Sequence, residues 1–111
     1  MSGVFDRIEK RKAFPIDVNG EVMHVAEPTM NQIDRIQRLK SNQATGLALG
    51  LCLVDEGGTR LFNPEPDQTD AAFADRILVE ASDCTVSAIR TLSEGILKLV
   101  KPVDQESLAK N

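Results

Sequence analysis

The chain has no tryptophan and no tyrosine among its 111 residues, and its aromatic side chains are four phenylalanines. The core must therefore be built from Leu, Ile, Val and Ala, a composition that suits helices. Only one His and two Cys are present, which is too few for a closed tetrahedral zinc site. We therefore expect no metal and no cofactor.

The chain also lacks a strongly basic region. Its 13 Lys and Arg against 17 Asp and Glu leave a net charge of −4, and the one basic run, Lys10 to Lys12, is short. Nucleic-acid binding relies on clustered basic residues, so this balance argues against it. The N-terminus does not read as a signal peptide and no apolar run is long enough to span a bilayer. These features predict a soluble, cytoplasmic protein with reduced cysteines.

Candidate catalytic residues are equally scarce. His24 and Cys52 form the available Cys–His combination, and Cys52 lies on an apolar helix face, where thiols are inert. Gly57-Gly58 is not followed by the Lys-Ser/Thr of a phosphate-binding loop. Asp55-Glu56 lacks the alternating ligands of a calcium loop. We expect no enzyme, although a small oligomeric enzyme built around His24 and Cys52 stays as a distant alternative.

What the sequence does contain is a clear β-hairpin. Asn19-Gly20 is typical of a type I′ turn, because both central residues of that turn need positive φ. Pairing outward from the turn sets opposite each other Val18 and Glu21, Ile16 and Met23, and Phe14 and Val25. One face of this ribbon is therefore apolar and must lie on the rest of the fold, because a two-stranded ribbon is marginal alone.

Helices are expected after the hairpin. Thr29 and Gln32 form a capping box for a helix that carries Met30, Ile33, Ile36 and Lys40 on one face. Three further helices are predicted from apolar periodicity and terminal signals: 44–52, about 68–81 with Asp67 as its cap, and one capped by Ser82-Asp83 with an apolar stripe of Val86, Ile89, Leu92, Ile96, Leu99 and Val100 that ends at Pro102.

Two glycines, Gly46 and Gly50, lie in the helix over 44–52 and are predicted to let another helix approach closely. The cysteines Cys52 and Cys84 both lie in apolar helical patterns. Residues 51–54 are ambiguous between helix and strand, and 59–62 read as a short extended segment after the Asp55–Gly58 turn. The fold class is thus α+β: a mostly helical single domain over 1–101, with the hairpin packed on about four helices.

The two ends of the chain are less defined. Residues 2–11 are predicted as a helix, which can be mobile, with a small apolar stripe of Val4, Phe5 and Ile8; whether this stripe docks on its own domain or on another subunit is left open. Residues 102–111 are predicted as a flexible tail. Candidate partner-binding residues are taken from three apolar surfaces: Val4, Phe5, Ile8, Phe14, Ile16, Met23, Leu92, Ile96 and Leu99. For the last helix, plain core packing is the favoured alternative.

The order of these parts resembles a known family. An extended strand leads into Glu27-Pro28-Thr29 and a helix, and an Asp55-Glu56-Gly57-Gly58 turn followed by Leu61-Phe62 precedes two closing helices. This pattern, over residues 13–101, is similar to the tail assembly chaperones of long, non-contractile-tailed bacteriophages.

The resemblance implies a chaperone without catalytic residues. Such proteins bind the tape measure protein, keep it soluble and promote assembly of the tail tube in the host cytoplasm, and they are absent from the mature virion. The family also implies contact with the tail tube protein and a longer form made by ribosomal frameshifting. Self-association into a homo-oligomer is expected if the apolar stripes are exposed.

The main alternative is a small dimeric DNA-binding regulator or antitoxin-like protein, with Ser41-Asn42 as a helix-turn-helix joint. Against it, residues 43–54 contain no Lys or Arg, whereas a recognition helix needs polar and basic side chains to reach base edges.

Overall fold

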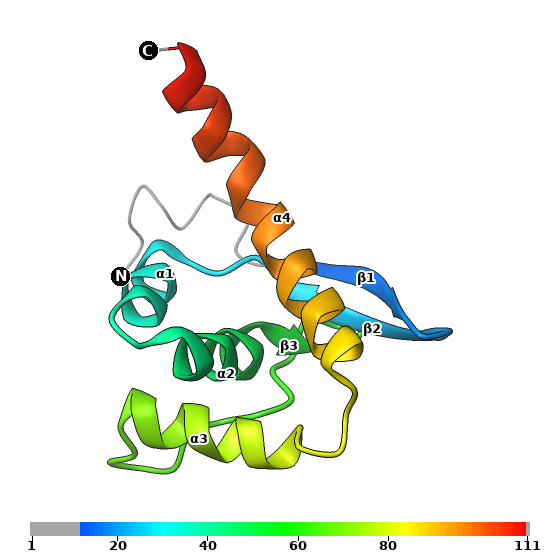
Figure 1. Ribbon diagram of the computed structural model, residues 1–111, viewed down its shortest axis with the longest axis vertical. Coiled ribbons are helices and arrows are strands. Elements are labelled where there is room, and N and C mark those ends of the chain that lie inside the picture. Colours follow the sequence, from blue (N-terminus) through cyan, green and yellow to red (C-terminus); the bar gives the residue numbers. More distant parts are fainter. Residues whose placement is uncertain (1–11, 111) are drawn as a thin grey trace.

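The computed structural model describes residues 12–110, with side chains through residue 100. A three-stranded antiparallel sheet in the order β1-β2-β3 packs with four helices, and the expected α+β architecture is confirmed (Figure 1). The elements in chain order are β1 (Ala13–Val18), β2 (Glu21–Ala26), α1 (Met30–Gln37), α2 (Ser41–Cys52), β3 (Leu53–Val54), α3 (Asp70–Glu80) and α4 (Val86–Lys110). The helix predicted over 2–10 lies outside the described residues.

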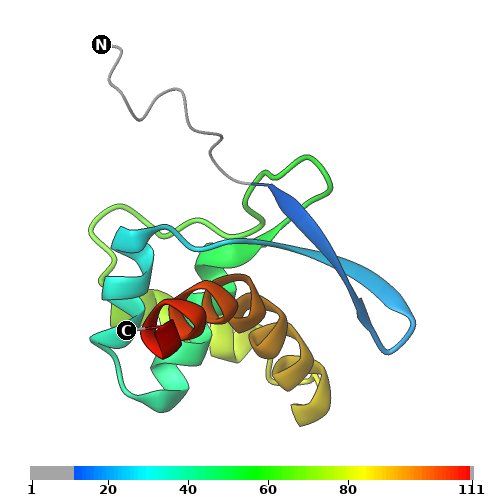
Figure 2. The ribbon, with the colours of Figure 1, turned by 90° about the horizontal axis from the view of Figure 1, so that it is seen from above.

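The hairpin of β1 and β2 has the predicted register, with Val18 opposite Glu21 and Phe14 opposite Val25. Asn19 and Gly20 have φ values of 54° and 90°, which is the backbone that the type I′ turn requires. The turn is closed further by the backbone N–H of Gly20, which donates to Oδ1 of Asp17 at 2.9 Å. In Figure 2 the hairpin projects to one side of the helices, beyond the body of the domain.

The third strand forms where the sequence was ambiguous. α2 ends at Cys52, and the next two residues, Leu53 and Val54, pair with β2 as β3. The segment predicted as extended after the Asp55–Gly58 turn adds only a single bridge, between Arg60 and Val54. The turn itself is held by Oδ1 of Asp55, which accepts from the backbone N–H groups of Gly57 and Thr59, each at 2.9 Å.

The predicted capping box starts α1. The backbone N–H of Gln32 donates to the Thr29 hydroxyl at 3.2 Å, and the backbone N–H of Thr29 donates to Oε1 of Gln32 at 3.0 Å. Gln32 is buried, and these two hydrogen bonds with Thr29 satisfy its backbone N–H and its side-chain oxygen. Other caps differ from expectation: Thr69, not Asp67, caps α3, and the hydroxyl of Thr85, not Ser82-Asp83, accepts from the first turn of α4. Thr69 and Thr85 are the residues in the cap position, so their hydroxyls reach the unpaired N–H groups.

α2 is the central helix of the domain. It lies between α3 on one side and α1 and α4 on the other (Figure 1). Gly46 and Gly50 meet α3 as predicted, since a Cβ at Gly46 would lie 2.6 Å from the Ala74 carbonyl oxygen, and one at Gly50 would lie 2.8 Å from the Phe73 ring. The core around this contact is aliphatic apart from Phe73, and its fully buried members include Leu47, Leu49, Leu51, Cys52, Ile77 and Val25.

α4 crosses the apolar face of the hairpin. Its Gly95 lies directly over the Ile16 side chain, with which any Cβ at that position would collide. Leu92 and Ile96, one turn apart, are buried in the core beneath. The helix continues through Pro102 to Lys110, so the predicted end at Pro102 is wrong. Proline removes one backbone donor and disfavours the helix interior, but it does not prevent a helix from running through.

Three side chains that the sequence places in apolar helical patterns are exposed. Met30, in the first turn of α1, is 88% exposed, and Val86, at the start of α4, is 72% exposed. Cys84 lies exposed in the connection between α3 and α4, outside any helix. Met30 and Val86 lie at helix ends and Cys84 lies just before one, where the chain enters or leaves the packed body and the periodicity of the interior no longer applies.

Candidate functional site

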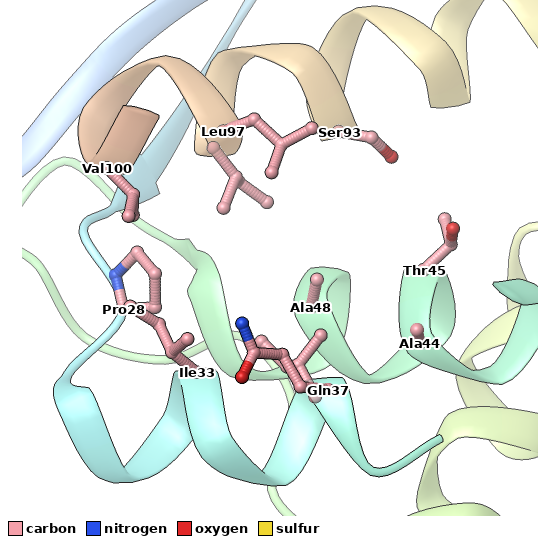
Figure 3. A pocket seen from close by; sticks show the side chains of 11 residues that line it. Pro28, Ile33, Gln37, Ala44, Thr45, Ala48, Ser93, Leu97 and Val100 are labelled. Carbon is pink, nitrogen blue, oxygen red and sulfur yellow. The ribbon is translucent and has the colours of Figure 1, made fainter. Parts of the chain in front are cut away.

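An apolar groove of about 460 Å³ lies between α1, α2 and α4 (Figure 3). Pro28 and Val100 lie at one end of it, and Ser93 and Thr45 lie at the other. The residues that line it come from the three helices and the link before α1: Pro28, Ile33, Ile36, Gln37, Ala44, Thr45, Ala48, Ser93, Ile96, Leu97 and Val100.

The groove exists because α2 presents small side chains to its two neighbours. Ala44 and Ala48 are four residues apart, so they lie one turn apart on the same face of α2, and Thr45 lies beside them. Methyl-sized side chains do not fill the space between helices at ordinary packing distance. α1 and α4 are also held by contacts elsewhere, and both contact α2 less extensively than α3 does.

On the α1 side of the groove, an ion pair joins α1 to α3. Arg35 donates from Nη2 to Oδ1 of Asp70 at 2.6 Å and from Nε to Oδ2 at 3.1 Å. This hydrogen bonding lowers the pKa of Asp70 and raises that of Arg35, although both side chains stay about one-third exposed. Asp70 is the first residue of α3, so the pair ties the start of that helix to α1.

On the α4 side, the wall is held by the same helix's contacts with the core and the hairpin. Ile96 is buried in the core and lines the groove, whereas the next residue, Leu97, lines the groove and is 55% exposed. Met30 extends the apolar surface at the α1 rim, because it lies seven residues before the lining residue Gln37 and thus on the same helix face. An open groove with exposed Leu and Met at its rim is a typical docking surface.

The polar groups of the groove are few and neutral. Gln37, Thr45 and Ser93 contribute them, and no charged side chain is among the lining residues. The Thr45 hydroxyl donates to the Ser41 carbonyl oxygen at 3.1 Å, within its own helix. The Ser93 hydroxyl oxygen is buried without a hydrogen-bond partner in the part of the chain that the structure describes. Such a surface suits an apolar occupant with a few polar atoms.

Of the sequence-predicted partner residues that the structure describes, Ile96 lines this groove and the others do not. Leu92 and Ile96 are 7% and 3% exposed and belong to the core, so the core-packing alternative describes them. Leu99 is half-buried against that core. Phe14, Ile16 and Met23 are half-buried, because α4 covers the apolar face of the hairpin on which they lie. Val4, Phe5 and Ile8 lie outside the described residues.

Sequence reasoning missed Leu97 as a surface residue. It falls beside the apolar stripe of α4, and the one available signal was a leucine adjacent to Ile96 that the stripe does not use. Ile33 and Val100 were recognised as apolar helix positions, and Ala44 and Ala48 fall in the helix predicted over 44–52, but their common groove requires three helices to meet. No pattern within a single helix predicts that meeting.

The structure also locates the groups considered for chemistry. Cys52 is fully buried in α2, and His24 is half-buried on β2 opposite Val54. Among residues 12–100, no three His, Cys, Asp or Glu side chains gather as they would around a metal ion. α2, the second helix of the proposed helix-turn-helix, carries six buried residues between Gly46 and Cys52. A helix packed on that scale is not free to enter a DNA groove.

The outer edge of β1 is the other open element of the described chain. In a hairpin with a two-residue turn, the pair flanking the turn exchanges both hydrogen bonds, so the next pairs alternate. Counting from Val18 and Glu21, Pro15 falls at a position whose backbone nitrogen faces the open edge. Proline has no N–H, so it removes the middle donor of that edge and disfavours pairing with another strand.

None of the described helices is long and apolar enough to cross a membrane. The groove between α1, α2 and α4 is the candidate functional site because of its shape and its apolar lining. Comparison of the chain with protein-family models, with curated proteins and with solved structures finds no match.

Proposed function

We propose that the chain is a tail assembly chaperone of a long, non-contractile-tailed bacteriophage, and that it binds the tape measure protein through the groove between α1, α2 and α4. The observation that carries the proposal is an apolar, uncharged groove that is open on the surface of a small helical domain. Amphipathic helices are recognised by laying their apolar face into a groove of this kind. A long helical client offers many such faces.

The charge of the chain supports the same role. A protein that holds an apolar client must keep the complex dispersed, and the net charge of −4 provides repulsion between complexes. Rim residues add adaptability, because Met30 is exposed and methionine conforms to different apolar surfaces. We propose a soluble protein of the host cytoplasm that is not retained in the virion, whose further partners are the tail tube protein, a longer frameshifted form of itself, and other copies.

The test is co-expression with the tape measure protein encoded beside it, followed by gel filtration. We expect soluble tape measure protein that co-elutes with the chain. Leu97→Glu places a charge in the rim of the groove and should abolish co-elution. Val79→Glu is the matched control, since Val79 is 72% exposed on α3, away from the groove, and it should leave co-elution intact.

Two results would contradict the proposal. One is tape measure protein that stays aggregated with both the short chain and any longer form read from an overlapping frame. The other is co-elution that Leu97→Glu and Val79→Glu affect equally, because the groove would then not be the binding surface. Salt-dependent retention of the chain on duplex DNA would instead favour the regulator alternative.

A further inference from the structure

We infer that the Asn19-Gly20 turn at the tip of the hairpin is a site of spontaneous deamidation, and that the carboxylate of Asp17 slows this reaction in the folded protein. Asn19 is one of five asparagines in the sequence and the sole one that is followed by glycine. Glycine has no side chain that would hinder the approach of its backbone nitrogen to the asparagine amide. The inference concerns the protein alone and does not depend on which partner it binds.

The reaction starts at the backbone nitrogen of Gly20. This nitrogen loses its proton to hydroxide and attacks the side-chain carbonyl carbon of Asn19, which closes a five-membered succinimide ring. The side-chain nitrogen takes up a proton and leaves as ammonia. Water then opens the ring at one of its two carbonyl groups and gives aspartate or isoaspartate. The net reaction consumes one water molecule and releases one ammonia, and no electrons are exchanged with another molecule.

The turn is open to water. Asn19 and Gly20 are both exposed, and a Cβ added to Gly20 would meet no atom within 4 Å. The hairpin also projects beyond the helices, so its tip lies away from the body of the domain (Figure 2). Water can therefore reach the reacting atoms, and the step that the structure can slow is the loss of the backbone proton of Gly20.

Asp17 holds that proton. The backbone N–H of Gly20 donates to Oδ1 of Asp17 at 2.9 Å. A hydrogen bond made by the protonated form of a group disfavours its deprotonated form, and a negative charge beside the group has the same effect. The nitrogen must become an anion before it attacks, so the Asp17 carboxylate raises the barrier on both counts. At this separation, one unit charge in water changes an equilibrium by a factor of roughly five to ten.

Deamidation changes both the charge and the backbone of the turn. A carboxylate at residue 19 lowers the net charge from −4 to −5 and adds to those of Asp17 and Glu21 in the same turn. Isoaspartate also routes the chain through the former side chain, which adds one carbon to the backbone. The two-residue turn that sets the register of β1 and β2 is then lost. Because Ile16 of β1 lies under Gly95 of α4, we expect isoaspartate to weaken the packing of α4 on the hairpin.

The experiment follows deamidation of Asn19 by peptide mapping and mass spectrometry while the full chain is incubated at neutral pH. We expect Asn19 to deamidate more slowly in the folded chain than in urea. Asp17→Ala should speed the reaction in the folded chain by roughly fivefold to tenfold. Glu21→Ala is the matched control, because Glu21 flanks the same turn on β2 but does not accept from the Gly20 N–H, and it should leave the rate nearly unchanged. Circular dichroism confirms that both variants fold.

A third variant, Asp17→Asn, separates the charge from the shape of the turn. Its side-chain oxygen can still accept from the Gly20 N–H, but it carries no net charge. We expect Asn19 to deamidate faster in this variant than in the wild type, with fragment ions assigning the modification to Asn19.

Four outcomes would overturn the inference. An Asn19 that stays intact even in urea would not be a deamidation site. Equal rates in the folded wild type and in urea would show that the fold gives no protection. Equal changes in Asp17→Ala and Glu21→Ala would indicate a general effect of charge. A rate in Asp17→Asn that matches the wild type would show that the turn geometry, and not the carboxylate, slows the reaction. No partner is present, so these outcomes are distinct from failure of the tape measure assay.

Discussion

The two sides of α2 carry small side chains at similar spacing, yet one side is closed and the other is open. Toward α3, Gly46 and Gly50 allow contact so close that a single added carbon would collide with Ala74 or Phe73. Toward α1 and α4, Ala44 and Ala48 line a groove of about 460 Å³. The difference shows that small residues permit a close approach but do not cause it. What decides is whether the neighbouring helix is free to move in or is held by other contacts.

The largest effect is expected from breaking the closed side. Gly46→Val forces a branched side chain against the Ala74 carbonyl oxygen on the α3 backbone, which cannot rotate away. We expect a loss of about 3 kcal/mol in the free energy of unfolding, at the upper end of overpacking effects. Urea denaturation measures it.

The control for the closed side is Ala44→Val, which places the same valine side chain on the open side of α2. It should change the free energy of unfolding by less than about 1 kcal/mol, because the added methyl groups enter the groove. Equal losses in Gly46→Val and Ala44→Val would contradict the contrast between a closed and an open side.

A smaller effect of opposite sign is expected from filling the open side. Ala48→Leu places an isobutyl group in the groove between α1 and α4. Filling an existing cavity commonly stabilises a protein, here by about 1 kcal/mol in urea denaturation. The same variant should lose co-elution with the tape measure protein. A stabilised variant that still binds would show that the partner uses another surface.

The smallest effect is expected at the ion pair that joins α1 to the start of α3. Asp70→Asn removes the carboxylate that Arg35 contacts, and it should cost about 0.5 kcal/mol at neutral pH, since the pair is partly exposed to solvent. Asp34→Asn is the control, because its pair with Arg38 is mostly exposed and should contribute close to nothing.

The Asp70 pair also predicts a pH dependence. Its pKa is lowered in the folded state by the hydrogen bond from Arg35, so the stabilisation is present above the unfolded pKa of about 3.9. It is lost as the pH falls through the lower folded value. The difference between wild type and Asp70→Asn should therefore be full at pH 7 and vanish in strong acid. A difference that persists at low pH would show that the variant acts through something other than the ion pair.

Local features were predictable from the sequence because neighbouring residues determine them. The hairpin register follows from Asn19-Gly20, whose turn geometry sets every later pair. The capping box follows from Thr29 and Gln32, three residues apart. The close approach at Gly46 and Gly50 was also predictable, but its partner, α3, was not.

Errors concentrated where a pattern reaches the edge of the packed body. Val86 keeps the period of the α4 stripe but lies before the helix meets the core, so it is exposed. Met30 shares a face with Ile33, yet among the described residues it is left 88% exposed in the first turn of α1. Leu92 and Ile96 were offered as partner residues, but the crossing of α4 over the hairpin buries them.

The amino-acid sequence by itself determined the hairpin, the start of α1 and the aliphatic core. Each depends on interactions within a few residues or on composition alone. Only the tertiary structure decided that α3 closes on α2 while α1 and α4 leave a groove there. That outcome depends on contacts between residues distant in the sequence, such as Arg35 with Asp70 and Gly95 with Ile16, which appear in no local pattern.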